Sequence, residues 1–212
     1  MYKLFYFPRN ASWAPHMVLH HMKVEYELVL VDRKTNEQKS ESYLKLNPTG
    51  RIPTLVDGDL SLFESAAICL HLCDQNPHAN LIPAIGNPDR PKFHQWLAYL
   101  TTTLQPELMI YFYPAKHTTD TAGELAIVAA QESRVAEMYS FLDEALEGRE
   151  FLIGSNVSVC DYFLFMLAHW GSGFSRPPLS YPNLGAYLRR LAKRETVKAV
   201  CAVEGTDLGA YN

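Results

Sequence analysis

The stretch "LNPTGRIPTLVDGDLSLFES" (residues 46–65) predicts a β-hairpin followed by a helix. "TLV" and "LSLF" are short strands, and the pair Asp57-Gly58 between them favours a tight turn. Glu64-Ser65 follows, where the sequence takes on helical periodicity. The segment therefore combines an X-Pro bond at Ile52-Pro53, a hairpin, and an acid and a hydroxyl at the start of a helix.

The residues before this stretch predict a strand, a helix and a second strand. "KLFYF" (residues 3–7) is short and aromatic, residues 14–22 have helical spacing, and "YELVLV" (residues 26–31) is rich in branched residues. Two parallel strands joined by a helix form a βαβ unit. Residues 33–42 are polar and charged, and we expect them to form a mobile connection.

The residues after it predict a second, helical domain. Residues 76–91 contain four prolines, which is typical of a linker. Helical spacing then continues without a convincing strand. These patterns predict an α/β domain at 1–78, a linker at 79–87 and an all-α domain at 88–212. The expected helical stretches are 92–112, 123–146, 159–170 and 183–198.

Composition excludes several classes of partner. The 212 residues carry a formal net charge of −4, and no run of basic residues exceeds Arg189-Arg190, so we expect no nucleic acid partner. No segment has the eighteen apolar residues of a membrane span, and the N-terminus lacks the features of a signal peptide. Four cysteines without framework spacing indicate free thiols. We therefore expect a cytoplasmic protein without a membrane partner.

Neither candidate metal pair is convincing. His16 and His20 share a helix face, but no third ligand can be identified. Cys69 and Cys73 also share a face, and within an apolar run they are better explained as core thiols. We expect no metal.

Two features of the opening stretch suit a small peptide. A trans bond is the more common state of any X-Pro pair, but a cis bond at Ile52-Pro53 would leave the Ile52 backbone free to pair with an extended peptide. Glu64-Ser65 favours a capped helix N-terminus. The same pair would also suit an α-amino acid end, because a helix N-terminus attracts the carboxylate and Glu64 can hold the ammonium.

The loop "PRNASWAP" (residues 8–15) lies where ligands bind in open α/β sheets, beyond the end of a strand. Ser12 is a good N-cap for a helix that begins at Trp13. Its hydroxyl could instead donate to an anion, and the side-chain amide of Asn10 could do the same.

Together these motifs resemble a cytosolic glutathione transferase, nearly from end to end. "NPTGRIPTL" followed by "FESAAI" is similar to the glutathione-site signature of that family. "SVCDYFLF" resembles the capping box of its sixth helix, and "YPNLGAYLRRLAKRETVKAV" resembles a late helix. The resemblance implies a thioredoxin-like N-terminal domain, an all-helical C-terminal domain and a homodimer.

The resemblance also implies roles for single residues. It implies a cis bond before Pro53, pairing of the Ile52 backbone with the cysteinyl part of glutathione, and a γ-glutamyl site at Glu64 and Ser65. The candidates for the glycine carboxylate are Arg51, Lys34 and Lys39.

The chain departs from the bacterial beta class, which its N-terminal loop resembles most. Ala11 stands where that class has a cysteine, and Gln105 stands where it has a histidine. We therefore expect Ser12 to activate the thiol, with Asn10 as the alternative. The expected electrophile pocket is lined by Trp13, Gln105, Tyr111 and Tyr113.

The expected function is conjugation of the glutathione thiolate to a small hydrophobic electrophile, as in detoxification. Glutathione is the co-substrate. The alternatives are glutathione-dependent reduction of a disulfide or peroxide, isomerisation, and a non-catalytic binding or regulatory role.

Overall fold

The computed structural model describes residues 1–212 and divides into two compact units. The first unit contains Met1–Ile82 together with Lys193–Ala210 and Asn212. The second contains Pro83–Ala192 and Tyr211. The predicted boundaries, 1–78 and 88–212, stay a prediction, but they assign the segment near the C-terminus to the helical domain, whereas it clusters with the first unit.

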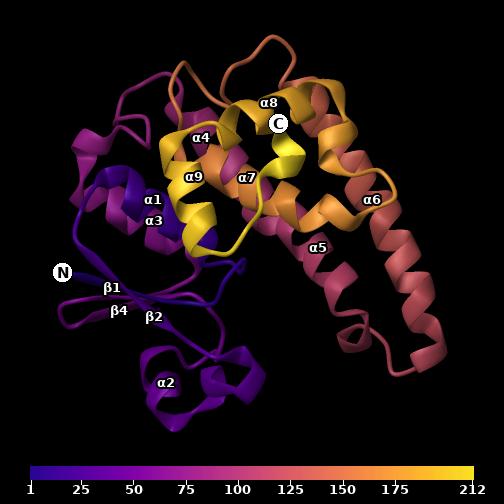
Figure 1. The fold of residues 1–212 in the computed structure, drawn as a ribbon, viewed down its shortest axis with the longest axis horizontal. Coiled ribbons are helices and arrows are strands. Elements are labelled where there is room, and N and C mark those ends of the chain that lie inside the picture. Colours follow the sequence, from indigo (N-terminus) through magenta and orange to yellow (C-terminus); the bar gives the residue numbers. More distant parts are fainter. The chain divides into compact units, whose positions relative to one another are not determined.

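The first unit is built on a four-stranded mixed sheet with the order β2-β1-β3-β4 (Figure 1). β1 pairs in parallel with β2, while β3 is antiparallel to both β1 and β4. This is the α/β arrangement predicted from the sequence. The strands are β1 (Tyr2–Tyr6), β2 (Tyr26–Leu30), β3 (Thr54–Asp57) and β4 (Leu60–Phe63).

Helices cover the sheet of the first unit. α1 packs against α3 and α9, and these helices lie on the side of the sheet opposite α2 (Figure 1). Leu4 of β1 and Leu55 of β3 are fully buried, as are Val18 of α1 and Leu72 of α3. The helices of this unit are α1 (Trp13–Met22), α2 (Glu41–Leu46), α3 (Ser65–Gln75) and α9 (Glu195–Val203).

The connection before Ile52-Pro53 contains regular structure, including α2, that the sequence did not predict. Residues 33–42 contain two 3-10 turns, Arg33–Thr35 and Glu37–Lys39, and the first residues of α2. The side chain of Ser40 caps α2 by accepting the backbone N–H of Tyr43. A helix of six residues, less than two turns, with one buried aromatic residue is too short to produce a helical pattern in the sequence.

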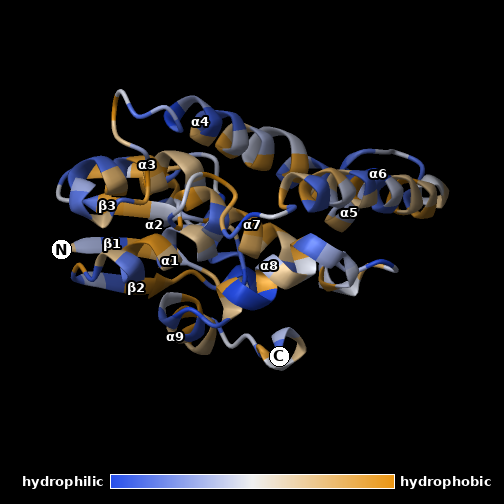
Figure 2. Cartoon of the chain, turned by 90° about the horizontal axis from the view of Figure 1, so that it is seen from above, coloured by the Kyte–Doolittle hydropathy of each residue, from blue (hydrophilic) through white to orange (hydrophobic).

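The second unit is entirely helical, as predicted. α7 forms its centre, because every residue from Val159 to Ala168 is buried. α6 and α8 carry both hydrophilic and hydrophobic residues along their length (Figure 2). The helices are α4 (Arg90–Ala98), α5 (Gln105–Phe112), α6 (Glu124–Ala145), α7 (Val159–Trp170) and α8 (Pro182–Ala192).

Two predicted helical stretches are interrupted. α4 and α5 are joined by a π-helical segment, Tyr99–Leu104, just before Pro106, which has no backbone N–H to continue the regular pattern. The stretch predicted at 183–198 ends with α8, and the extended backbone of Arg194 precedes α9 in the first unit. None of the helices is long and apolar enough to cross a membrane.

Candidate functional site

The sheet register brings three segments to one edge of the first unit. Phe5 of β1 pairs with Thr54 of β3, and Thr54 pairs with Phe63 of β4. β1 and β4 therefore end where β3 begins. The loop after β1, the Ile52-Pro53 segment before β3 and the start of α3 after β4 all leave the sheet at this edge. The register thus brings Ile52, Glu64 and Ser65 to the edge that also carries the loop after β1.

The loop after β1 presents Asn10 and Ser12 in different states. The Ser12 hydroxyl is fully buried and donates to the carbonyl of Phe7 at 3.2 Å. The backbone N–H of Ala11 donates to Oδ1 of Asn10 at 2.9 Å, which leaves Nδ2 of Asn10 as a donor without a partner. Ser12 precedes α1 as expected, but its side chain makes no capping bond. Of the two predicted donors, only Asn10 has a donor group that is still available.

The peptide bond Ile52-Pro53 is cis. The carbonyl of the preceding residue, Arg51, accepts from Tyr43 Oη at 2.7 Å and from Asn47 Nδ2 at 2.8 Å. Those two bonds fix the backbone just before Ile52, whose own N–H and C=O make no hydrogen bond. A backbone donor and acceptor held in place without partners can pair with an extended peptide.

Glu64 and Ser65 begin α3 in an unusual conformation. Glu64 has φ +70°, outside the regions that residues with a Cβ normally occupy, and its side chain is exposed without a partner. Ser65 is buried and donates to the carbonyl of Ala11 at 2.8 Å, so it does not cap the helix. The bond joins the start of α3 to the loop that carries Asn10. An exposed carboxylate therefore stands beside an open helix N-terminus.

The three basic candidates differ in position. Lys39 lies over Gly50, and its Nζ donates to the carbonyl of Thr49 at 3.2 Å. A Cβ at Gly50, which has φ +60°, would lie 2.5 Å from that ammonium, so glycine makes the approach possible. The side chains of Arg51 and Lys34 are exposed. Of the three, Lys39 is the one whose side chain contacts the segment just before Ile52.

The residues predicted for the electrophile pocket belong to both units. Trp13 is fully buried in the first unit. Gln105 and Tyr111 lie on α5 and Tyr113 follows it, all within the second unit. The ring of Tyr111 packs against Phe174, with 4.4 Å between centroids. Their role as one pocket stays a prediction.

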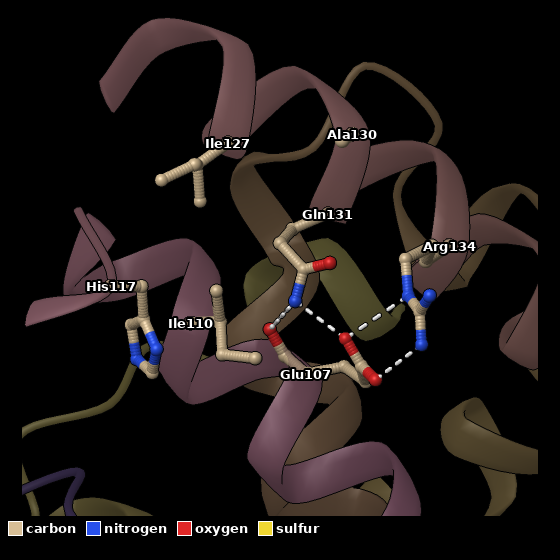
Figure 3. Close-up of a pocket in the computed structure, with 7 residues that line it drawn as sticks. All are labelled: Glu107, Ile110, His117, Ile127, Ala130, Gln131 and Arg134. Atoms are coloured by element: carbon tan, nitrogen blue, oxygen red, sulfur yellow. Dashed lines mark hydrogen bonds and ion pairs between the residues drawn. The ribbon is translucent and has the colours of Figure 1, made fainter. Parts of the chain in front are cut away.

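The second unit has a hollow of about 370 Å³ between α5 and α6 that sequence reasoning did not find (Figure 3). Glu107 accepts from Arg134 at 2.6 and 3.2 Å and also from Gln131. Burial raises the pKa of Glu107, but the bonds from Arg134 and Gln131 outweigh it and hold the pKa below its usual range. Since these groups satisfy one another across the two helices, we interpret the cluster as a brace between α5 and α6.

Two family models and several known proteins match this chain. Residues 1–74 match the family model "Glutathione S-transferase, N-terminal domain", and residues 103–195 match "Glutathione S-transferase, C-terminal domain". The chain is 28% identical to glutathione S-transferase GstA of Escherichia coli O157:H7 over 206 residues, which cover 96% of this chain and 98% of the relative.

Solved structures extend the similarity. A sphingomonad glutathione S-transferase complexed with glutathione is 33% identical, with a TM-score of 0.84 over 97% of this chain and 100% of that one. A beta class enzyme from Sphingomonas chungbukensis is 32% identical, with a TM-score of 0.83 over the same shares. The chain therefore belongs to the glutathione S-transferase family of transferase enzymes. This confirms the predicted family and the predicted combination of a thioredoxin-like and an all-helical domain.

Proposed function

We propose that the protein binds glutathione at the sheet edge of the first unit and transfers its thiolate to a small hydrophobic electrophile. The observation that carries the proposal is the set of unpartnered groups at this edge. The Ile52 backbone suits the cysteinyl part, and the Glu64 carboxylate suits the γ-glutamyl ammonium. Lys39 is the choice for the glycine carboxylate. The glutathione complex of the sphingomonad relative supports this assignment.

In this proposal Asn10 activates the thiol, and Ser12 holds the loop through its bond to the Phe7 carbonyl. Nδ2 of Asn10 can donate to sulfur without giving up another bond, whereas the hydroxyl of Ser12 would first have to leave the Phe7 carbonyl. A donor aimed at sulfur favours the thiolate over the thiol and lowers the thiol pKa. Trp13, Gln105, Tyr111 and Tyr113 are proposed to contribute to the electrophile site.

Glutathione-dependent reduction of a disulfide is the second candidate. None of the four cysteines forms a disulfide and all four are buried, so the protein offers no accessible thiol of its own. Reduction at this site would therefore need a second glutathione to resolve the mixed disulfide. Free thiols also favour a reducing compartment such as the cytoplasm. We further propose that the protein is a homodimer.

The test pairs glutathione binding with turnover. Calorimetry should show binding to the wild type that weakens roughly thirtyfold in Glu64→Gln, because a hydrogen bond between charged groups is worth about 2 kcal/mol. Asp74→Asn is the control, since it removes an exposed acid at the other end of α3. The wild type should then turn over an aryl halide faster than a disulfide or peroxide. Unchanged affinity in Glu64→Gln would contradict the assigned site.

A further inference from the structure

Glu204 places a buried carboxylate beneath the loop that carries Asn10. It follows α9 directly and is 1% exposed. Its Oε2 accepts the backbone N–H of Arg9 at 2.7 Å, and its Oε1 lies 2.8 Å from Nδ1 of the fully buried His16 in α1. Nothing in the sequence near the loop indicates this contact, because 195 residues separate Glu204 from Arg9.

The loop needs this acceptor because of its backbone. Arg9 has φ +59°, a left-handed conformation that is strained for a residue with a Cβ. The bond from its N–H to Glu204 restrains the turn at that residue. On the other side of Asn10, the Ala11 carbonyl is held by Ser65. Asn10 is therefore fixed between two anchors, one from the end of α9 and one from the start of α3.

We propose that Glu204 is a positioning residue, which holds Arg9 so that the amide of Asn10 is aimed at the sulfur of bound glutathione. The inference rests on the proposed function and adds a residue to it. Glu204 touches no substrate in this scheme and acts only through the loop. A misplacement of about 1 Å can lower a reaction rate by about a hundredfold.

The length of the Glu204 side chain, and not its charge, holds the loop in position. An amide of the same length can accept from Arg9 and donate to His16, which would then take its other neutral tautomer. Two tyrosines lie next to the Glu204–His16 pair. Their ring centroids are 6.3 Å (Tyr6) and 5.7 Å (Tyr26) from the centroid of His16. Burial, and secondarily the charge of Glu204, raises the pKa of both tyrosines, so they remain neutral neighbours.

Two conservative variants separate the effect of side-chain length from the effect of charge. Glu204→Gln keeps the length and removes the charge, whereas Glu204→Asp keeps the charge and shortens the side chain by one methylene. We expect kcat in Glu204→Gln to stay within about twofold of the wild type, and kcat in Glu204→Asp to fall by about tenfold or more. Affinity for glutathione should change less than about twofold in both, because the groups that bind it are untouched. Glu195→Gln, an exposed acid of α9, is the control and should match the wild type.

Amide hydrogen exchange of residues 9–12 provides a readout that needs no substrate. Exchange should be faster in Glu204→Asp and unchanged in Glu204→Gln. The positioning role would be overturned if exchange and kcat in Glu204→Asp equalled those of the wild type. It would also be overturned if both variants showed the same increase in exchange and the same loss of kcat. A wild type that does not bind glutathione while exchange follows the expected order would contradict the proposed function and leave the anchoring of the loop supported.

Discussion

Asn10 and Ser12 lie two residues apart in one loop, and their hydrogen bonds leave an available donor in Asn10 alone. Both were nominated because a polar loop after the first strand suits an anion. Which one has a free donor depends on Phe7 and Ala11, whose backbone groups take up one end of each side chain. Which donor stays available follows from the loop geometry and cannot be predicted from the residue types. Glu204 is a stronger case, since only the folded chain brings it to Arg9.

At the scale of elements, strands and long helices were predictable because their patterns are local. The hairpin around Asp57-Gly58 and the helix of 159–170 occur as expected. α2 is less than two turns long and shows no periodicity in the sequence, and helical spacing that continues through Arg194 hides the break after α8. Element ends depend on caps and on neighbours more than on periodicity.

The cap of α7 gives a prediction at this scale. Asp161 is fully buried and accepts from the N–H of Leu152 and Ser158, the hydroxyl of Ser158 and the hydroxyl of Tyr187, at 2.6–2.9 Å. Asp161→Ala leaves these buried donors without an acceptor and should lower the free energy of unfolding by about 3 kcal/mol.

Asp143 offers a matched control for that variant. It accepts the N–H groups of Asn183 and Leu184 at the start of α8, at 2.7 Å each, but it is only half-buried. Asp143→Ala should cost about 1 kcal/mol, the usual value of a helix cap. Chemical denaturation measures both, and equal losses would contradict the claim that burial makes the Asp161 cap the more important one.

At the scale of the whole molecule, the sequence predicted two parts but could not show that residues 193–210 return to the first. The second unit also exposes an aromatic cluster. Phe141 is 48% exposed and lies 5.7 Å from Trp96 and 5.4 Å from Tyr99 between ring centroids. A hollow of about 400 Å³ adjoins it, lined by Tyr99, Arg134, Glu137, Met138 and Phe141.

This surface predicts how the proposed homodimer is held together. Aromatic residues are enriched in interfaces, and a surface with both Arg134 and Glu137 can pair with its own copy about a two-fold axis. Light scattering should give twice the 24.0 kDa of one chain for the wild type and a single chain for Phe141→Glu. Leu125→Glu, which is 80% exposed on the same helix, should stay dimeric. A monomeric wild type would disprove the prediction.

The pKa of the glutathione thiol bound to the protein is the property that activation by Asn10 should change. It can be followed by the ultraviolet absorbance of the thiolate against pH. Burial raises the pKa of Cys73 and Cys201 to about 12, so these protein thiols do not titrate in the same range. In the wild type we expect the pKa of the bound thiol to lie about two units below the free value of about 8.5–9.

The variants decide which group is responsible. Asn10→Ala removes the donor that stabilises the thiolate, so the bound thiol pKa should rise by about one unit and the pH profile of kcat/KM should move to higher pH with it. In Ser12→Ala, whose fold is checked first, the pKa of the bound thiol should stay within about 0.3 units of the wild-type value. A titration of Asn10→Ala that overlays the wild type, or a larger shift in Ser12→Ala, would show that Asn10 is not the group that stabilises the thiolate.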